Sequence, residues 1–157
     1  MKILVFSDSH SKGPDLARLA EAARPDCIFH LGDCVRDTLG LSVSAPVTAV
    51  RGNCDFAGGD LGGCPLQTTL DLEGVRVLLM HGHTLQVKTS LDRLWFCARE
   101  QGAQLALFGH THTAYAAEKS GVMLFNPGSI SEPRGGAPSY GVLTLENGTF
   151  TCRHIYL

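Results

Sequence analysis

The sequence predicts an α/β fold in which two packed sheets carry helices on their outer faces, a four-layer α/β/β/α sandwich. Two observations support this class. Short apolar runs, each the length of one strand, recur along the chain and are interrupted by two segments of helical periodicity. Two pairs of runs are joined by residues that are typical of hairpin turns. No repeat, linker or charge block divides the chain, so we expect residues 1–157 to form a single domain.

The first third of the chain predicts a largely parallel sheet with a helical face. The apolar run Lys2 to Phe6 is followed by polar residues, which predicts a buried strand. Residues 14–24 predict a helix, because apolar residues recur there at helical spacing and Pro14 suits the first turn. Cys27 to His30 and Val47 to Arg51 predict two further short strands. The order strand, helix, strand, strand favours parallel pairing.

The rest of the chain predicts two hairpins with a helix and two strands between them. The hairpin strands are Thr68–Leu72 with Arg76–Met80, and Tyr140–Leu145 with Thr149–Tyr156. Glu73-Gly74 and Asn147-Gly148 separate the partners, and an Asn-Gly pair is a strong hairpin signal. Residues 90–102 predict a helix that Gly102 ends. Leu105–Phe108 and Val122–Phe125 predict the remaining strands.

The composition is that of a soluble globular protein, with 44% hydrophobic and 18% charged residues and a net charge of -2. This charge provides no long-range positive field to hold nucleic acid. The N-terminal apolar run has the length of a strand, too short for a signal peptide or a membrane span, so we expect a cytoplasmic protein. The six cysteines contain no C-x-x-C pair and are expected to be reduced and mostly buried.

Polar loops of one chemical kind follow five of the apolar runs. The loops are Ser7-Asp8-Ser9-His10, Gly32-Asp33, Gly52-Asn53-Cys54-Asp55, His81-Gly82-His83 and Gly109-His110-Thr111-His112. Any one of these motifs is common in ordinary turns. However, ligands of open α/β sheets bind beyond the carboxyl ends of the strands, so the five loops are expected to converge on one crevice. The ordered set therefore predicts a metal site.

The donor atoms of these loops suit divalent cations. Carboxylate, amide oxygen and imidazole ligands bind hard to borderline ions. Several such groups around one pocket can hold two cations about 3.5–4 Å apart, the arrangement used in phosphoryl transfer. One carboxylate has to bridge the two ions. Asp33 is the natural candidate, because it lies between Asp8 and His81 in the series.

The ordered motifs resemble the calcineurin-like metallophosphoesterase superfamily. The matching series is Asp8-x-His10, Gly32-Asp33, Gly52-Asn53, His81-Gly82 and Gly109-His110-x-His112. The Gly-Asn-Cys-Asp and His-Gly-His forms, together with Asn126-Pro127-Gly128-Ser129, resemble its small bacterial and archaeal phosphodiesterase branch. The match runs from Lys2 to about Arg134. That family's fold is the four-layer sandwich of two mixed sheets expected above, and Asn126 to Ser129 is expected to form a fixed turn beside the site.

The resemblance implies a role for each ligand position. Asp8, His10 and His112 would hold the first metal, and Asn53, His81 and His110 would hold the second. Asp33 would bridge them. The family's metals imply manganese, with iron, zinc or nickel as alternatives. The implied reaction is hydrolysis of a phosphoester, with a small phosphodiester favoured, by a hydroxide bridging the two cations. No membrane or nucleic-acid partner is expected, and a homo-oligomer stays open.

One position departs from the family pattern. Many relatives carry a histidine directly after the asparagine, where it is thought to protonate the leaving oxygen, and this chain carries Cys54. A thiol is a weak donor for that purpose. Asn53 and Cys54 are therefore the candidate catalytic residues, and a nucleophilic Cys54 stays an alternative. The alternative functions are a phosphomonoesterase and an interaction module like the retromer subunit of the same fold, whose metal site is modified.

Several other residues have both a functional and an ordinary structural interpretation. His83 could support a ligand or contact the substrate, or have no role. Arg36, Arg51 and Arg134 could each bind a phosphate or form an ordinary ion pair. The glycine-rich stretch Ala57 to Gly63 lacks the Lys-Ser/Thr of a nucleotide-binding loop and is expected to lie at the mouth of the site.

Overall fold

The computed structural model describes residues 1–55 and 63–157. The stretch Ala57–Gly63, expected at the mouth of the site, therefore lies outside the described residues except for Gly63. No helix among the described residues has the length and hydropathy needed to cross a bilayer.

Two five-stranded mixed sheets form the centre of the molecule. The first has the strand order β10-β9-β1-β2-β3 and the second β4-β5-β6-β8-β7. The strands are β1 Lys2–Phe6, β2 Cys27–His30, β3 Val47–Ala49, β4 Gln67–Leu72, β5 Val75–Met80, β6 Leu105–Leu107, β7 Ala114–Lys119, β8 Val122–Pro127, β9 Ser139–Glu146 and β10 Thr149–Tyr156. The helices are α1 Gly13–Ala23 and α2 Asp92–Glu100, with short 3-10 turns η1 Val35–Thr38 and η2 His83–Leu85. The strands β1, β2 and β3 pair in parallel, as the first third of the sequence predicts.

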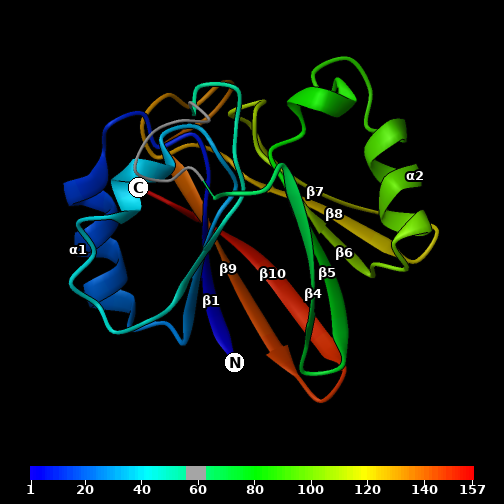
Figure 1. The fold of residues 1–157 in the computed structure, drawn as a ribbon, viewed down its shortest axis with the longest axis horizontal. Coiled ribbons are helices and arrows are strands. Elements are labelled where there is room, and N and C mark those ends of the chain that lie inside the picture. The colour runs from blue at the N-terminus through cyan, green and yellow to red at the C-terminus, as the bar shows by residue number, and fades with distance from the viewer. Residues whose placement is uncertain (56–62) are drawn as a thin grey trace.

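Each sheet is covered on its outer face by one helix, with α1 on the first sheet and α2 on the second (Figure 1). Residues alternate between the two faces of a strand, so every buried strand supplies two apolar layers. In β1, Leu4 and Phe6 pack with Leu16 of α1, whereas Ile3 and Val5 face the second sheet. This double burial explains why the strands have continuous apolar runs, and it gives the four predicted layers.

The second sheet repeats this pattern. Leu78 and Met80 of β5 pack with Leu94 of α2, whereas Val77 and Leu79 face the first sheet. The inner faces of both sheets thus share one core, whose side chains are almost fully buried. Because the core fixes the position of both sheets, it also fixes the relative positions of the loops that leave their ends.

The predicted turns and helix ends are confirmed with small shifts of boundary. Asn147 and Gly148 have φ of 48° and 78°, and positive φ at both residues is the geometry that a two-residue hairpin requires. Pro14 lies in the first turn of α1. Gly102 follows α2 with φ of 66°, which ends the helix as expected.

One strand, β7, was not predicted from the sequence. Its residues, AYAAEK, show no alternation of apolar and polar side chains, and Ala, Glu and Lys have low strand propensity. It forms because the neighbouring strand β8 offers unpaired backbone groups, with which β7 pairs in antiparallel register. The strand lies at the edge of the second sheet, where a polar sequence is tolerated.

Candidate metal centre

Loops from both sheets meet at one end of the sandwich. The first sheet contributes the loops after β1, β2 and β3, and the second contributes those after β5 and β6. These loops gather at the upper end of the molecule in Figure 1. The five polar motifs therefore converge as the sequence predicts, and the centre joins the two sheets.

The backbone turns sharply at the predicted ligands. The residues with positive φ include Asp8, His10, Asp33, His110 and His112, at 41–66°. This conformation is unfavourable for residues other than glycine, at about 1–3 kcal/mol each, and it persists only where the surroundings enforce it. Strained residues of this kind gather at functional sites, and here the strain lies at five of the seven predicted ligands.

The first group of donors consists of Asp8, His10, Asp33 and His112, whose ligand atoms all lie within 4.8 Å of one another. The Nδ1 atom of His112 lies 2.8 Å from the carbonyl oxygen of Glu132, which leaves Nε2 free to face the centre. There it lies 3.1 Å from Oδ1 of Asp8. The Asp8 carboxylate at this distance raises the pKa of His112.

Two buried atoms of this group lack hydrogen-bond partners among the described residues, Oδ1 of Asp8 and Nε2 of His10. A buried polar atom without a partner costs free energy, so such atoms are rare in native proteins. A carboxylate oxygen and an imidazole nitrogen are both lone-pair donors. A cation at this position would satisfy both, and the residues present therefore fit a metal ion.

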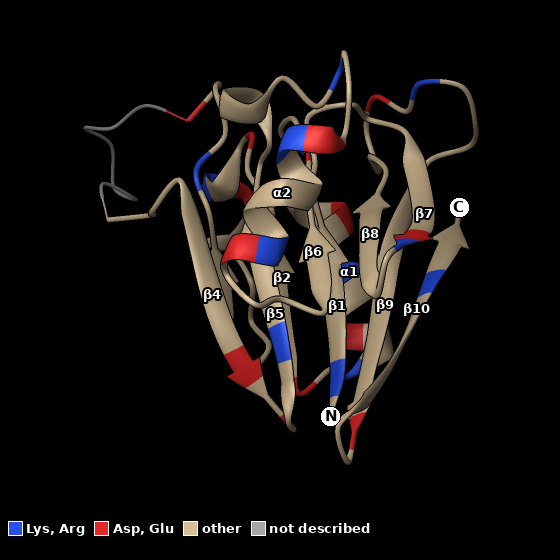
Figure 2. Cartoon of the chain, turned by 90° about the vertical axis from the view of Figure 1, so that its right-hand side faces the viewer, with Lys and Arg blue, Asp and Glu red and all other residues tan. Residues whose placement is uncertain are grey.

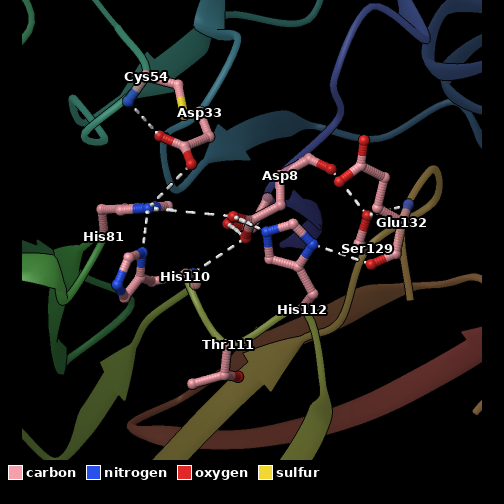
Figure 3. A network of polar contacts seen from close by, with 12 residues as sticks. Asp8, Asp33, Cys54, His81, His110, Thr111, His112, Ser129 and Glu132 are labelled. Atoms are coloured by element: carbon pink, nitrogen blue, oxygen red, sulfur yellow. Dashed lines mark hydrogen bonds and ion pairs between the residues drawn. The ribbon is translucent and has the colours of Figure 1, made fainter. Parts of the chain in front are cut away.

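The second group of donors is Asp33, His81 and His110, again with ligand atoms within 4.8 Å of one another. His81 is oriented by its Nδ1 atom, which lies 2.8 Å from the carbonyl oxygen of Leu31. Its other nitrogen, Nε2, faces the centre (Figure 3). The atoms around Nε2 are Nδ1 of His110 at 3.2 Å, Oδ1 of Asn53 at 3.1 Å and Oδ2 of Asp33 at 3.4 Å. Lone-pair donors converge here too, as around a second cation.

The charge state of these groups favours metal ligation. Burial alone would raise the pKa of Asp33, but hydrogen bonding to His81 and to the Cys54 amide lowers it well below the usual range. Burial, together with repulsion from His81, lowers the pKa of His110 to about 4. At neutral pH Asp33 is therefore a carboxylate and His110 a neutral imidazole, which are the forms that bind metals.

Asp55 ties two of the ligand loops together, and sequence reasoning gave it no role. Its carboxylate accepts hydrogen bonds from the backbone N–H groups of Asp33 at 2.8 Å, Val35 at 2.9 Å and Gly52 at 2.9 Å. Gly52 is needed in this arrangement, because a Cβ there would lie 2.2 Å from Oδ1 of Asp33. The sequence feature that could have indicated this role was the position of Asp55 as the last residue of the Gly-Asn-Cys-Asp motif.

The segment Asn126 to Ser129 borders the site and fixes its loops as predicted, although its first two residues end strand β8 instead of forming a turn. The Ser129 hydroxyl donates to the carbonyl of Asp8 at 2.7 Å and accepts from the N–H of Glu132 at 2.9 Å. The Asn126 amide donates to the carbonyl of Gly109 at 2.9 Å. Both side chains are fully buried, so these contacts hold the loops after β1 and β6 in a fixed relation.

Cys54 and His83 lie beside the donor groups rather than within them. Cys54 is exposed, and its backbone N–H donates to Oδ1 of Asp33 at 2.8 Å. Burial and the Asp33 carboxylate raise the pKa of Cys54 to about 11, which keeps it a thiol at neutral pH. The His83 ring lies 5.4 Å from that of His81. All six cysteines are free, as expected, but none is fully buried.

Comparisons with known proteins give the centre a family context. The family model of the calcineurin-like phosphoesterase superfamily domain matches residues 1–148. YsnB of Bacillus subtilis, a probable metallophosphoesterase, is 36% identical over 156 residues, which cover 98% of this chain and 89% of that protein. The phosphodiesterase YfcE of Escherichia coli is 38% identical over 107 residues, covering 64% of this chain and 54% of that protein. Among solved structures, Vps29 of Entamoeba histolytica complexed with Zn²⁺ has a TM-score of 0.79 at 21% identity, with 99% of each chain covered.

At its level of identity, the likeness to Vps29 shows the fold alone. The match to the family model is more informative, because residues 1–148 include all five loops and both donor groups. The Bacillus relative matches over nearly the same length. The chain therefore belongs to the calcineurin-like phosphoesterase superfamily.

Proposed function

We propose that residues 1–157 act as one metallophosphoesterase domain that hydrolyses small phosphodiesters. The observation that carries this proposal is Asp33, the one residue that the two donor groups among the described residues share. A carboxylate between two groups of lone-pair donors is what a pair of neighbouring cations requires. The buried, unpartnered donor atoms of Asp8 and His10 support the same arrangement.

The metals we propose are two divalent cations, with Mn²⁺ as the preferred ion and iron, zinc or nickel as alternatives. When bound, such cations supply Lewis acidity, which activates water and neutralises charge on the phosphoryl group. Asp8, His10 and His112 would hold the first ion, and Asn53, His81 and His110 the second. The carbonyls of Leu31 and Glu132 keep two of these imidazoles in the required orientation.

The presence of Cys54 in place of a stronger acid predicts faster hydrolysis of diesters with good leaving groups than of alkyl monoesters. A side-chain acid near the departing oxygen contributes roughly 10²–10⁴-fold to the rate. The Cys54 thiol, with its pKa raised to about 11, is too weak an acid to supply much of this help. The phosphodiesterase YfcE, at 38% identity, supports the same substrate class.

A small substrate is favoured over nucleic acid. Figure 2 shows basic and acidic residues interspersed along the elements on this side of the molecule. The net charge of -2 also provides no general attraction for a polyanion. We propose that recognition is confined to groups close to the metal centre.

The proposal is tested on purified protein that has been stripped with a chelator and reloaded with Mn²⁺. We expect turnover of bis(p-nitrophenyl) phosphate by the loaded protein, slower turnover of p-nitrophenyl phosphate, and none after chelation. Asp33→Asn is expected to abolish the activity, because it removes the charge of the one residue that both donor groups of the described chain share. Turnover without metal, or a phosphoryl-cysteine trapped by rapid quenching, would overturn the mechanism. Metal binding without turnover of any phosphoester would favour an interaction module of this fold.

A further inference from the structure

A groove whose wall includes the candidate ligand His112 lies beside the first donor group. It has a volume of about 80 Å³ and is lined by residues 112–114, residues 133–137 and Tyr156. One water needs about 10–15 Å³ of such space, so the groove has room for a group of several heavy atoms. His112 belongs both to the first donor group and to the groove wall, so the groove adjoins the metal centre.

The groove is positively charged and lacks a balancing acid. Arg134 lines it, and no Asp or Glu does so. The Arg134 side chain forms no salt bridge with any described residue, although an ordinary ion pair was the alternative expected from sequence. A larger cavity of about 310 Å³ lies beside Arg36, but Asp37 lines that cavity too and offsets its charge. The groove at Arg134 is therefore the better anion site.

The backbone holds Arg134 in a fixed position relative to the metal centre. Its N–H donates to the carbonyl of His112 at 2.9 Å, and its carbonyl accepts from the Thr113 hydroxyl at 3.0 Å. The next three N–H groups, of residues 135–137, donate no hydrogen bond to a described residue. Free N–H groups that follow one another in a loop can bind an anion. A guanidinium and free amides thus border the same groove.

We propose that this groove binds a second anionic group of the substrate, so that the preferred phosphodiesters carry a further phosphate on one ester arm. This inference rests on the proposed phosphodiesterase function and narrows its substrate class. Arg134 binds the additional phosphate through its planar, two-pronged guanidinium. The exposed ring of Tyr156 provides the apolar wall along which the ester arm lies.

The kinetic test uses two substrates that differ by one anionic group, the p-nitrophenyl ester of thymidine 5′-phosphate with and without a 3′-phosphate. We expect the wild-type protein, loaded with Mn²⁺, to have a KM about twofold to fivefold lower for the substrate with the 3′-phosphate, as an ion pair at an exposed side chain provides. In Arg134→Gln the ratio of the two KM values is expected to fall to about one. Arg36→Gln is the matched control, since it removes the same charge from the other cavity, and it should keep the wild-type ratio.

A second measurement does not depend on turnover. Phenyl phosphate is titrated into ¹⁵N-labelled, metal-free protein, and the amide resonances are followed by NMR. We expect shifts at Gly135 and Gly136 in the wild type and in Arg36→Gln, and their loss in Arg134→Gln.

The outcomes separate this inference from the proposed function. The anion-binding groove is overturned if the wild type has equal KM values for the two esters, or if the lower KM for the 3′-phosphate substrate persists in Arg134→Gln. The proposed phosphodiesterase activity stands in both cases. If the wild type cleaves neither ester, the phosphodiesterase fails, and the NMR titration alone decides whether the groove binds an anion. An absence of shifts at Gly135 and Gly136 in the wild type would overturn the assignment of the groove as an anion site, whether or not the esters are cleaved.

Discussion

At the scale of single residues, Cys54 is the feature that distinguishes this centre from the family pattern. It follows Asn53 directly, at the position where many relatives carry a histidine, and its amide is bonded to the shared carboxylate of Asp33. Partial burial and the neighbouring carboxylate raise the pKa of the thiol to about 11. Cys54 is therefore neither an ionised nucleophile nor an effective acid at neutral pH.

We expect Cys54→His to help substrates with poor leaving groups. An imidazole near the departing oxygen can donate the proton that the thiol supplies poorly, so kcat/KM for alkyl esters should rise by about 10–100-fold, below the full range of acid catalysis. Aryl esters, which leave as stable phenolates, should change little. The measurement is kcat/KM against leaving-group pKa for the wild type, Cys54→His and the control Cys54→Ala. Equal slopes for all three would mean that another group, such as His83, already donates the proton.

At the scale of elements, the site depends on loops that approach one another more closely than a side chain permits. Gly52, after β3, lies against Asp33, after β2, and Asp55 fixes both through backbone N–H groups. His30, in β2, lies beneath these loops with no exposed surface. Its Nε2 atom lies 3.1 Å from the hydroxyl of Ser9, in the loop after β1. The end of β2 and the loops after β1, β2 and β3 are therefore packed against one another as one unit.

Gly52→Ala is expected to disrupt the metal centre. The new Cβ would lie 2.2 Å from Oδ1 of Asp33 and 2.5 Å from its backbone nitrogen, so the loop has to move. We expect loss of bound metal, together with a destabilisation of about 1–3 kcal/mol, as overpacking typically causes. Elemental analysis and urea unfolding measure the two effects. Gly40→Ala is the control, since nothing lies within 4 Å of its Cβ, and wild-type metal content in Gly52→Ala would contradict the expectation.

The buried His30 predicts a pH dependence of stability. Burial lowers its pKa from 6.5 to about 4, so the folded protein keeps His30 neutral where the unfolded chain binds a proton. Folding stability is therefore lost as the pH falls from about 6.5 towards 4, and between pH 7 and pH 5 His30 accounts for about 2 kcal/mol of the loss. Urea unfolding of the chelator-treated protein at both pH values tests this. In His30→Gln the difference between pH 7 and pH 5 should shrink by that amount, and an unchanged difference would show that His30 is protonated in the fold.

At the scale of the whole molecule, the candidate ligands connect the two sheets. Asp8, His10, Asp33 and Asn53 follow strands of the first sheet, and the other three predicted ligands follow strands of the second. The two groups of donors each combine residues from both sheets, since His112 joins the first group and Asp33 the second. Binding of cations should therefore oppose separation of the sheets, which is part of global unfolding.

We expect Mn²⁺ to raise the melting temperature of the chelator-treated protein by about 5–10 °C. A ligand at about 100 times its Kd stabilises the folded state by about 2.7 kcal/mol, and each kcal/mol shifts Tm by about 2–4 °C for a chain of this size. Asp33→Asn should lose most of this shift. Asp71→Asn, at an exposed carboxylate that pairs with Arg76 on the neighbouring strand, should keep it. A shift of wild-type size in Asp33→Asn would contradict the shared role of this carboxylate.

The sequence by itself determined all the strands except β7, the two helices and the position of the candidate ligands along the chain. Continuous apolar runs such as Lys2–Phe6 indicate strands that are buried on both faces, because each face meets another layer. The polar motifs after these runs predicted the donors, since a strand end and its loop are encoded by adjacent residues. The seven predicted ligands are indeed gathered at one end of the sandwich.

Only the tertiary structure decided which of these residues touch and what holds them. The amide of His110 bonds to the carboxylate of Asp8 across 102 residues, and Ser129 bonds to the carbonyl of Asp8 across 121. The strand β7 owes its conformation to its partner β8, and Asp55 owes its role to two loops that it binds. Local sequence patterns reflect neighbours along the chain, whereas these contacts depend on how two sheets pack through their shared core. That packing brings distant residues together without leaving a periodic trace in the sequence.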